Sequence, residues 1–236
     1  MQKVAIINPH LKHQLEHAEA LEASGWRISH QARAKGDVIL VSGPHFALQQ
    51  QLGHPRLIML DRAFWDDPAQ VTAWHIDAKT GERRPPPARA DRELWHPEPR
   101  PWKTREQSAV ILCDYGMDPP AELISAAKAR FHCVRIRKHP AEAPAGQVSL
   151  GATLAITDCA IGWKSSALVE AAIMGNPVVC GDPRNPAAPV SAGHLDATLY
   201  RGERRDWLEG LANTQVSIKE ISRGLLSTLF APIFRD

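Results

Sequence analysis

Cysteine is scarce and scattered in this sequence. Four cysteines occur in 236 residues, Cys113, Cys133, Cys159 and Cys180, and they lack the close pairs that a zinc site or a disulfide framework requires. Each lies in or beside an apolar, strand-like run, where a reduced cysteine behaves as a small hydrophobic residue. We therefore expect neither disulfides nor a cysteine zinc site, and no bound metal.

Long apolar runs and a surplus of one charge are also missing. No window is apolar over the length of a membrane span, and the first apolar run, Lys3 to Ile7, is too short for a signal peptide and has no cleavage site. This pattern predicts a cytoplasmic protein without integral membrane association. The net charge of only +2 is far from the basic balance of a dedicated nucleic-acid binder.

Short apolar runs alternate with helical patterns, which predicts parallel βα units. In the first half we expect strands at 3–8, 37–42 and 56–61 and helices at 11–23 and 45–52. In the second half we expect strands at 108–113, 133–137, 154–159 and 177–181 and helices at 120–131, 165–174, 207–211 and 218–229.

Residues 85–105 interrupt this alternation with six prolines and many arginines. Proline removes the backbone donor that core helices and central strands need, so the segment reads as a linker. We predict an N-terminal domain over 1–84, a Pro- and Arg-rich linker over 85–105 and a C-terminal domain over 106–236 with terminal helices. The predicted fold class is α/β, with two small Rossmann-like domains facing a cleft.

Two strand ends in the C-terminal half carry groups that can hold a phosphate. His139 and Pro140 end a β-branched run, and Ser165 and Ser166 open a short apolar helix. A helix start with hydroxyls and free N–H groups binds anions. Because ligands bind beyond the carboxyl ends of strands in open α/β sheets, we expect the loops that follow these strands to converge.

The order His-Pro, then Ser-Ser opening a helix that ends in Gly-Asn-Pro-Val-Val, resembles the donor half of GT-B-type glycosyltransferases, particularly bacterial sialyltransferases and capsule Kdo transferases. The resemblance implies that His139, Ser165 and Ser166 contact the nucleotide phosphate of a sugar donor. It also implies a nucleotide sugar as co-substrate, no separate cofactor, and C-terminal helices that pack across both domains.

Further candidates lie beside these motifs. Lys138 could neutralise the leaving phosphate, and Gly116 and Gly162 bring no Cβ and so allow the backbone to approach it closely. Glu170 lies one helical turn after Ser166 and could accept a hydrogen bond from the ribose. The ordinary alternatives are a serine that caps its helix, a His-Pro turn and a solvated glutamate.

Inverting glycosyl transfer also needs a base that takes the acceptor's proton. The acidic pair followed by glycine that is typical of the family is missing here. Asp61, at the end of the predicted strand 56–61, is the best candidate, with Asp66 and Asp67 as substitutes. Alternatively, Asp61 pairs with Arg62 or caps a turn.

The acceptor stays open between a saccharide and a modified DNA base, as in phage-type DNA glycosylation. A basic cluster of Arg100, Lys103 and Arg105 around Trp102 keeps the DNA branch open, although such clusters are commonly solvated surface. A different class of function is a non-catalytic nucleotide or nucleic-acid binding protein on the same scaffold, which the missing acidic pair favours.

His13 and His17, in the pattern His-x-x-Glu-His, match a metalloprotease motif. On a helix these histidines share a face, as zinc ligation requires. The motif lies in the first helix of an apparent βαβ unit, and no helix with a third ligand is evident. We therefore give this reading little weight.

Overall fold

The computed structural model describes residues 1–8, 12–42, 48, 50–62, 70–86 and 96–232. The chain forms two compact units, each with its own sheet. Unit 1 comprises residues 1–95 and 209–236, and unit 2 comprises residues 96–208. Both units are α/β, so the predicted fold class is confirmed. The boundaries differ from the expected ones, because residues 209–236 lie in unit 1 and residues 96–105 lie in unit 2.

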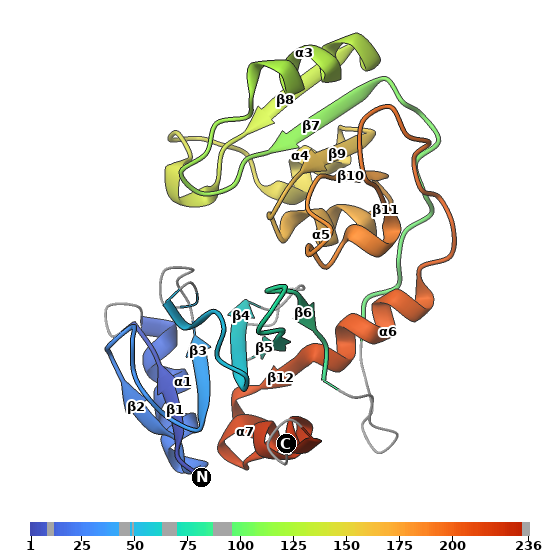
Figure 1. The fold of residues 1–236 in the computed structure, drawn as a ribbon. Coiled ribbons are helices and arrows are strands. Elements are labelled where there is room, and N and C mark those ends of the chain that lie inside the picture. Colours follow the sequence, from blue (N-terminus) through green and yellow to red (C-terminus); the bar gives the residue numbers. More distant parts are fainter. Residues whose placement is uncertain (9–11, 43–47, 49, 63–69, 87–95, 233–236) are drawn as a thin grey trace. The chain divides into compact units, whose positions relative to one another are not determined.

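Unit 1 is built on a mixed sheet (Figure 1). Its elements are β1 (Lys3–Ile6), α1 (Lys12–Ala23), β2 (Arg27–Ser29), β3 (Val38–Ser42), β4 (Leu57–Arg62), β5 (Gln70–Ile76), β6 (Arg83–Arg84), β12 (Gln215–Ser217), α7 (Ile218–Ser222) and α8 (Leu225–Leu229). Within the described chain the strand order is β12-β5-β4-β3-β1-β2, with β6 paired to β5. Strands β1 to β4 are parallel, whereas β5 runs antiparallel to β4, β6 and β12.

The end of the chain completes the core of unit 1. Ile221, Leu226 and Phe230 are almost fully buried and pack in one cluster with Leu21 and Ile58. This cluster explains why residues 209–236 belong to the first unit: without them one side of its sheet would lose its apolar cover. The helix predicted over 218–229 is divided into α7 and α8, because Gly224, the second of the two residues between them, adopts a left-handed conformation.

Unit 2 is built on a parallel sheet. Its elements are β7 (Ser108–Leu112), α3 (Ala121–Arg130), β8 (Cys133–Arg137), the 3-10 turn η1 (Pro140–Glu142), α4 (Leu150–Ala155), β9 (Cys159–Gly162), α5 (Ala167–Ile173), β10 (Val178–Cys180), the 3-10 turn η2 (Ala188–Val190) and β11 (Ser191–Ala192). Helix α6 (Arg205–Thr214) contains the boundary between the units. Figure 1 shows α3 beside β8, and α5 beside β9 and β10.

The strand order of unit 2 creates a switch point. The order is β11-β10-β9-β7-β8 within the described residues, and the four pairings between these strands are all parallel. The chain passes from β7 outward to β8 and then returns to β9 on the other side of β7. After β7 and after β9 the chain therefore continues toward opposite edges of the sheet, and open α/β sheets bind ligands at the carboxyl ends of two such neighbouring strands.

The strand predicted over 154–159 is wrong. Residues 150–155 form α4, and the strand, β9, begins only at Cys159. Ser149 starts the helix by accepting a hydrogen bond from the Ala152 N–H at 3.2 Å, which is the usual action of an N-terminal cap. Cys159, Ala160 and Ile161 are fully buried, as expected of a central parallel strand.

Lys103, in the predicted linker, closes the other end of α4. Its ammonium donates to the carbonyl oxygens of Leu154 at 2.6 Å, Ala155 at 3.1 Å and Thr157 at 2.6 Å. Burial lowers the pKa of Lys103. This basic residue therefore satisfies the last carbonyls of a helix.

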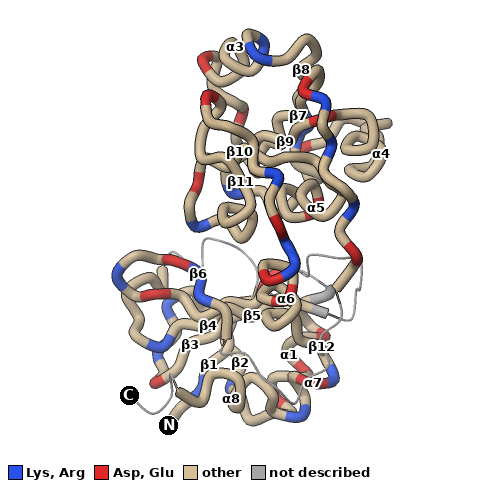
Figure 2. The backbone as a smooth tube through the Cα atoms, turned by 90° about the vertical axis from the view of Figure 1, so that its right-hand side faces the viewer, with Lys and Arg blue, Asp and Glu red and all other residues tan. Residues whose placement is uncertain are grey.

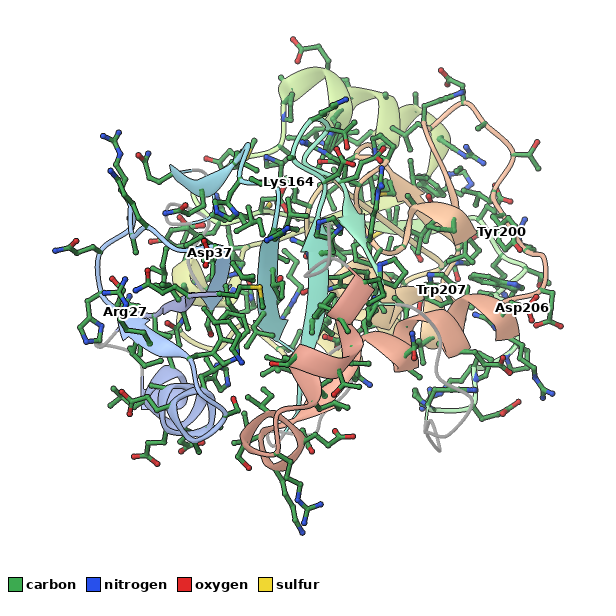
Figure 3. All side chains as sticks on the ribbon, turned by 60° about the horizontal axis from the view of Figure 1, so that its bottom comes forward. Arg27, Asp37, Lys164, Tyr200, Asp206 and Trp207 are labelled. Atoms are coloured by element: carbon green, nitrogen blue, oxygen red, sulfur yellow. The ribbon has the colours of Figure 1, made fainter. Side chains whose placement is uncertain are left out.

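The side chain of Trp102 likewise makes its contacts inside unit 2. The Arg204 guanidinium lies 3.7 Å from the centroid of its ring, and its indole N–H donates to the Gly202 carbonyl at 2.8 Å. Tyr200, labelled in Figure 3, packs edge-on against the same ring. The second part of the Pro- and Arg-rich segment is thus fixed to unit 2.

Candidate functional site

Two loops meet across the switch point of unit 2. The β7 loop (residues 113–118) follows β7, and the β9 loop (residues 163–166) follows β9. The carboxylate of Asp114 accepts a hydrogen bond from the backbone N–H of Lys164 at 3.2 Å. Lys164 is labelled in Figure 3. This bond holds the first residues of both loops together, as the convergence expected from the sequence requires.

The β8 loop (residues 138–142) is joined to the β7 loop by several contacts. The ring of Tyr115 packs edge-on against His139, with centroids 5.4 Å apart. The Gly116 N–H donates to the Glu142 carboxylate at 3.0 Å. The Lys138 ammonium pairs with Asp118, and this hydrogen bond raises the pKa of Lys138. These contacts hold the loop that carries Gly116 against the loop that carries Lys138 and His139.

His139 has a defined orientation. Its Nδ1 accepts a hydrogen bond from the Ala141 N–H at 3.2 Å, so the ring caps the turn η1. An imidazole whose Nδ1 is an acceptor carries its proton on Nε2 when neutral. The His-Pro turn thus orients an N–H donor at the carboxyl end of β8.

Ser166 occupies the cap position of α5 without acting as a cap. Its side chain makes no capping hydrogen bond, whereas Ser149 and Ser217 cap α4 and α7 through their hydroxyls. Ser166 is exposed, and Ser165 beside it is half-buried. The ordinary reading of Ser166 as a helix cap is therefore not supported by its contacts.

The β9 loop is anchored by a residue that the sequence did not single out. The amide nitrogen of Asn185 donates to the carbonyls of Trp163 at 2.9 Å and Ser165 at 3.2 Å, and its oxygen accepts from the Ala187 N–H at 2.9 Å. Asn185 is only 5% exposed. An asparagine before a proline commonly marks a turn, and nothing in the local pattern indicated contacts with a loop 20 residues earlier.

Trp163 is held against the end of β10. A Cβ on Gly181 would lie 2.5 Å from the indole ring, so a residue with a side chain at position 181 would displace it. Trp163 is still 38% exposed. Glycine at 181 therefore lets the indole ring of the β9 loop pack against the end of β10.

Asp182 and Arg184 form a bidentate ion pair next to this loop. The guanidinium donates through Nε at 2.9 Å and Nη2 at 2.8 Å. These hydrogen bonds, and to a smaller degree the charge of Lys164, lower the pKa of the buried Asp182 carboxyl. The pair keeps an ionised carboxylate in the loop after β10.

Gly162 and Glu170 each have a structural role within unit 2. Gly162 is the last residue of β9 and is buried, and a Cβ there would lie 3.2 Å from the Leu112 carbonyl. Glu170 is half-buried on α5. Burial of Arg137, at the end of β8, lowers the pKa of that guanidinium, and the negative charge of Glu170 partly offsets this effect. Contacts with a donor remain a proposal for both residues.

Asp61 lies in unit 1, inside β4 rather than after it. Its carboxylate pairs with the Arg83 guanidinium of β6 at 3.3 Å. The expected alternative was a pair with Arg62, whose side chain is not described. Asp66 and Asp67 lie outside the described residues.

Only part of the His-x-x-Glu-His pattern is described by the structure. His17 is buried on α1, and its Nδ1 lies 3.0 Å from the Ser42 hydroxyl, while the side chain of His13 is not described. Among the described residues, no group of three or more metal-ligating side chains could hold an ion. Within the same described residues, no helix has the length and apolarity of a membrane span.

Comparison with known proteins places the fold. The sequence matches no family model and no curated protein. Among solved structures, the chain is similar to the KpsC beta Kdo 2,7 transferase of Thermosulfurimonas dismutans, with a TM-score of 0.53 and 12% identity over 97% of this chain and 99% of that chain. It is also matched to the KpsC beta Kdo 2,4 transferase of the same organism, with a TM-score of 0.47 and 10% identity over 90% of each chain. The first match confirms, at the level of the fold, the resemblance to capsule Kdo transferases.

Proposed function

We propose that this protein is a glycosyltransferase that moves a sugar from a nucleotide-sugar donor to an acceptor hydroxyl. The observation that carries the proposal is the meeting of Gly116, Lys138 and His139 beside the Ser165 and Ser166 loop at the switch point of unit 2. The fold likeness to a Kdo transferase supports it.

The donor phosphate would be held by hydrogen-bond donors and positive charge. The Lys138 ammonium and the His139 Nε2–H compensate the charge that develops when the bond between the sugar and the phosphate breaks. Ser165 and Ser166 donate through their hydroxyls, and Glu170 accepts from the ribose. Because these side chains supply the compensation themselves, the proposed reaction does not depend on a metal ion.

Transfer also requires removal of a proton. The acceptor hydroxyl loses its proton to a carboxylate as its oxygen bonds to the anomeric carbon and the nucleotide phosphate leaves. Asp61 is the proposed base. The hydrogen bond from Arg83 holds the Asp61 carboxylate in one orientation, and a general base needs a fixed orientation toward the proton that it accepts.

A saccharide is the favoured acceptor. The DNA alternative was based on the basic cluster, but Lys103 and Trp102 are engaged inside unit 2. Elsewhere, Lys and Arg are interspersed with Asp and Glu along the described chain (Figure 2). Salt-sensitive binding to duplex DNA would restore the DNA branch, since phosphate contacts release counterions.

A thermal-shift screen tests the donor site. The full chain is heated with CMP, UDP, GDP and their sugar conjugates, because a ligand that binds only the folded state raises the apparent melting temperature. We expect one nucleotide to stabilise the protein and this shift to be lost in His139→Ala and reduced in Ser166→Ala. Ser149→Ala, which removes a true helix cap, should keep the full shift. Equal shifts in all variants would place the nucleotide elsewhere.

A non-catalytic nucleotide-binding protein is the second candidate. It is favoured by the ion pair of Asp61 within a strand, since this carboxylate has a structural partner. Donor hydrolysis or transfer that is lost in Asp61→Asn, with nucleotide binding retained, would support the enzyme. Nucleotide binding without any turnover in the unmodified protein would support the second candidate.

A further inference from the structure

The groups proposed to bind phosphate are already occupied by carboxylates of the chain itself. The Gly116 N–H donates to Glu142, and the Lys138 ammonium pairs with Asp118. Gly116 adopts a left-handed conformation (φ 72°), and nothing lies within 4 Å of where its Cβ would be. Gly116 is exposed, so an external anion can reach its amide.

Carboxylate and phosphate oxygens compete for the same donors. Both are charged acceptors that form short, strong hydrogen bonds with N–H groups and ammonium groups. The carboxylates here are also easy to displace. Glu142 is exposed, the side chain of Asp118 is 76% exposed, and that of Lys138 is 38% exposed. Exposed pairs of this kind contribute little stability.

We propose that Glu142 and Asp118 form a self-inhibitory latch that occupies the anion site until a phosphate-bearing ligand displaces both carboxylates. The identity of that ligand as a nucleotide sugar rests on the proposed function, whereas the latch itself requires only a phosphate group. The latch also holds the β7 loop to the β8 loop. Its release therefore separates residues 115–118 from Lys138 and Glu142.

The latch predicts whether neutralising Glu142 and Asp118 raises or lowers the affinity for an anion. If Glu142 and Asp118 only supported the loops, neutralising them would weaken anion binding or leave it unchanged. If they compete with the ligand, neutralising them tightens binding. Glu142→Gln and Asp118→Asn keep the shape of each side chain and remove its charge, so they separate the two roles.

The test is a titration of the full chain with inorganic pyrophosphate, followed by calorimetry and by the NMR signal of the Gly116 amide. We expect each single variant to bind pyrophosphate up to about fivefold more tightly, since each removes one exposed contact of the kind that contributes little stability. The double variant should bind more tightly than either. Glu142→Gln should also move the Gly116 amide signal before any ligand is added.

Glu122→Gln is the matched control, because it removes one exposed carboxylate from the neighbouring helix α3. It should leave pyrophosphate affinity unchanged. Three results would overturn the latch: equal tightening in the control, no tightening in the double variant, or no pyrophosphate binding by any form. Tightening without binding or turnover of any nucleotide sugar would instead leave the latch in place and refute the proposed function.

Discussion

The two units share a sheet topology but complete it from different parts of the chain. In unit 1 the order β2-β1-β3-β4, and in unit 2 the order β8-β7-β9-β10, place the second strand outside the first and the third on the other side. Unit 2 is one continuous segment, whereas unit 1 needs residues from both ends of the chain. A substitution can therefore change the stability of unit 1 without touching the candidate donor site.

The largest effect should come from Phe230→Ala. Phe230 is fully buried in the core of unit 1, and removing a buried aromatic ring typically costs about 3–5 kcal/mol of unfolding free energy. We expect unit 1 to lose this stability while unit 2 keeps its own. Hydrogen exchange resolved by segment measures both.

Phe131→Ala is the reciprocal variant. Phe131 is 2% exposed in the core of unit 2, so the loss should appear there instead. If both substitutions destabilise both units to the same extent, the separation of the two cores is incorrect.

Lys103→Ala should have the next largest effect, confined to unit 2. It leaves the last carbonyls of α4 without their donor, and hydrogen bonds with charged groups contribute about 1.5–3 kcal/mol. Denaturant unfolding measures the loss, and Arg105→Ala, at an exposed position, should be nearly neutral. A variant with unchanged stability but weaker duplex DNA binding would contradict the structural role of Lys103.

Asp182→Asn should destabilise unit 2 by about 1 kcal/mol at neutral pH, because it weakens a bidentate ion pair between a buried carboxylate and a half-exposed guanidinium. The pKa of Asp182 is lowered in the folded state, so its contribution is present above the ordinary value of 3.8 and is lost as the pH falls through the lower folded value. Acid unfolding curves should therefore converge for the unmodified protein and Asp182→Asn. Curves that stay parallel would show that the ion pair contributes nothing.

The smallest effect separates two serines at helix starts. Ser149→Ala removes a capping hydrogen bond and should cost about 1 kcal/mol. Ser166→Ala removes no such bond and should leave thermal stability unchanged. An equal loss in both variants would return Ser166 to the role of an ordinary cap.

The elements that the sequence predicted well are local ones. Residues 133–137 form a strand as expected, and Ser166 immediately precedes α5, because β-branched runs and helix starts have signals within a few residues. Strand β12 was missed because its pairing with β5 joins segments far apart in the sequence. Helix α4 was mistaken for a strand because its apolar residues continue into β9, and the bonds from Lys103 that end the helix come from a distant segment.

In the candidate site, too, residues with local sequence signals could be predicted and residues that act through distant contacts could not. His139 and Ser166 could be chosen from the sequence because each follows or precedes a recognisable element. Asn185 and Glu142 could not, because their importance lies in contacts with the β9 loop and the β7 loop. Such contacts depend on how the loops converge at the switch point, which residue spacing does not determine.

The most direct test of the account is segment-resolved hydrogen exchange of the full chain with and without the nucleotide sugar that gives the largest thermal shift. We predict new protection in the β7, β8 and β9 loops of unit 2, because the donor phosphate should bind where they meet. Protection confined to other segments, or none with any nucleotide sugar, would contradict the claim that this switch point is the donor site.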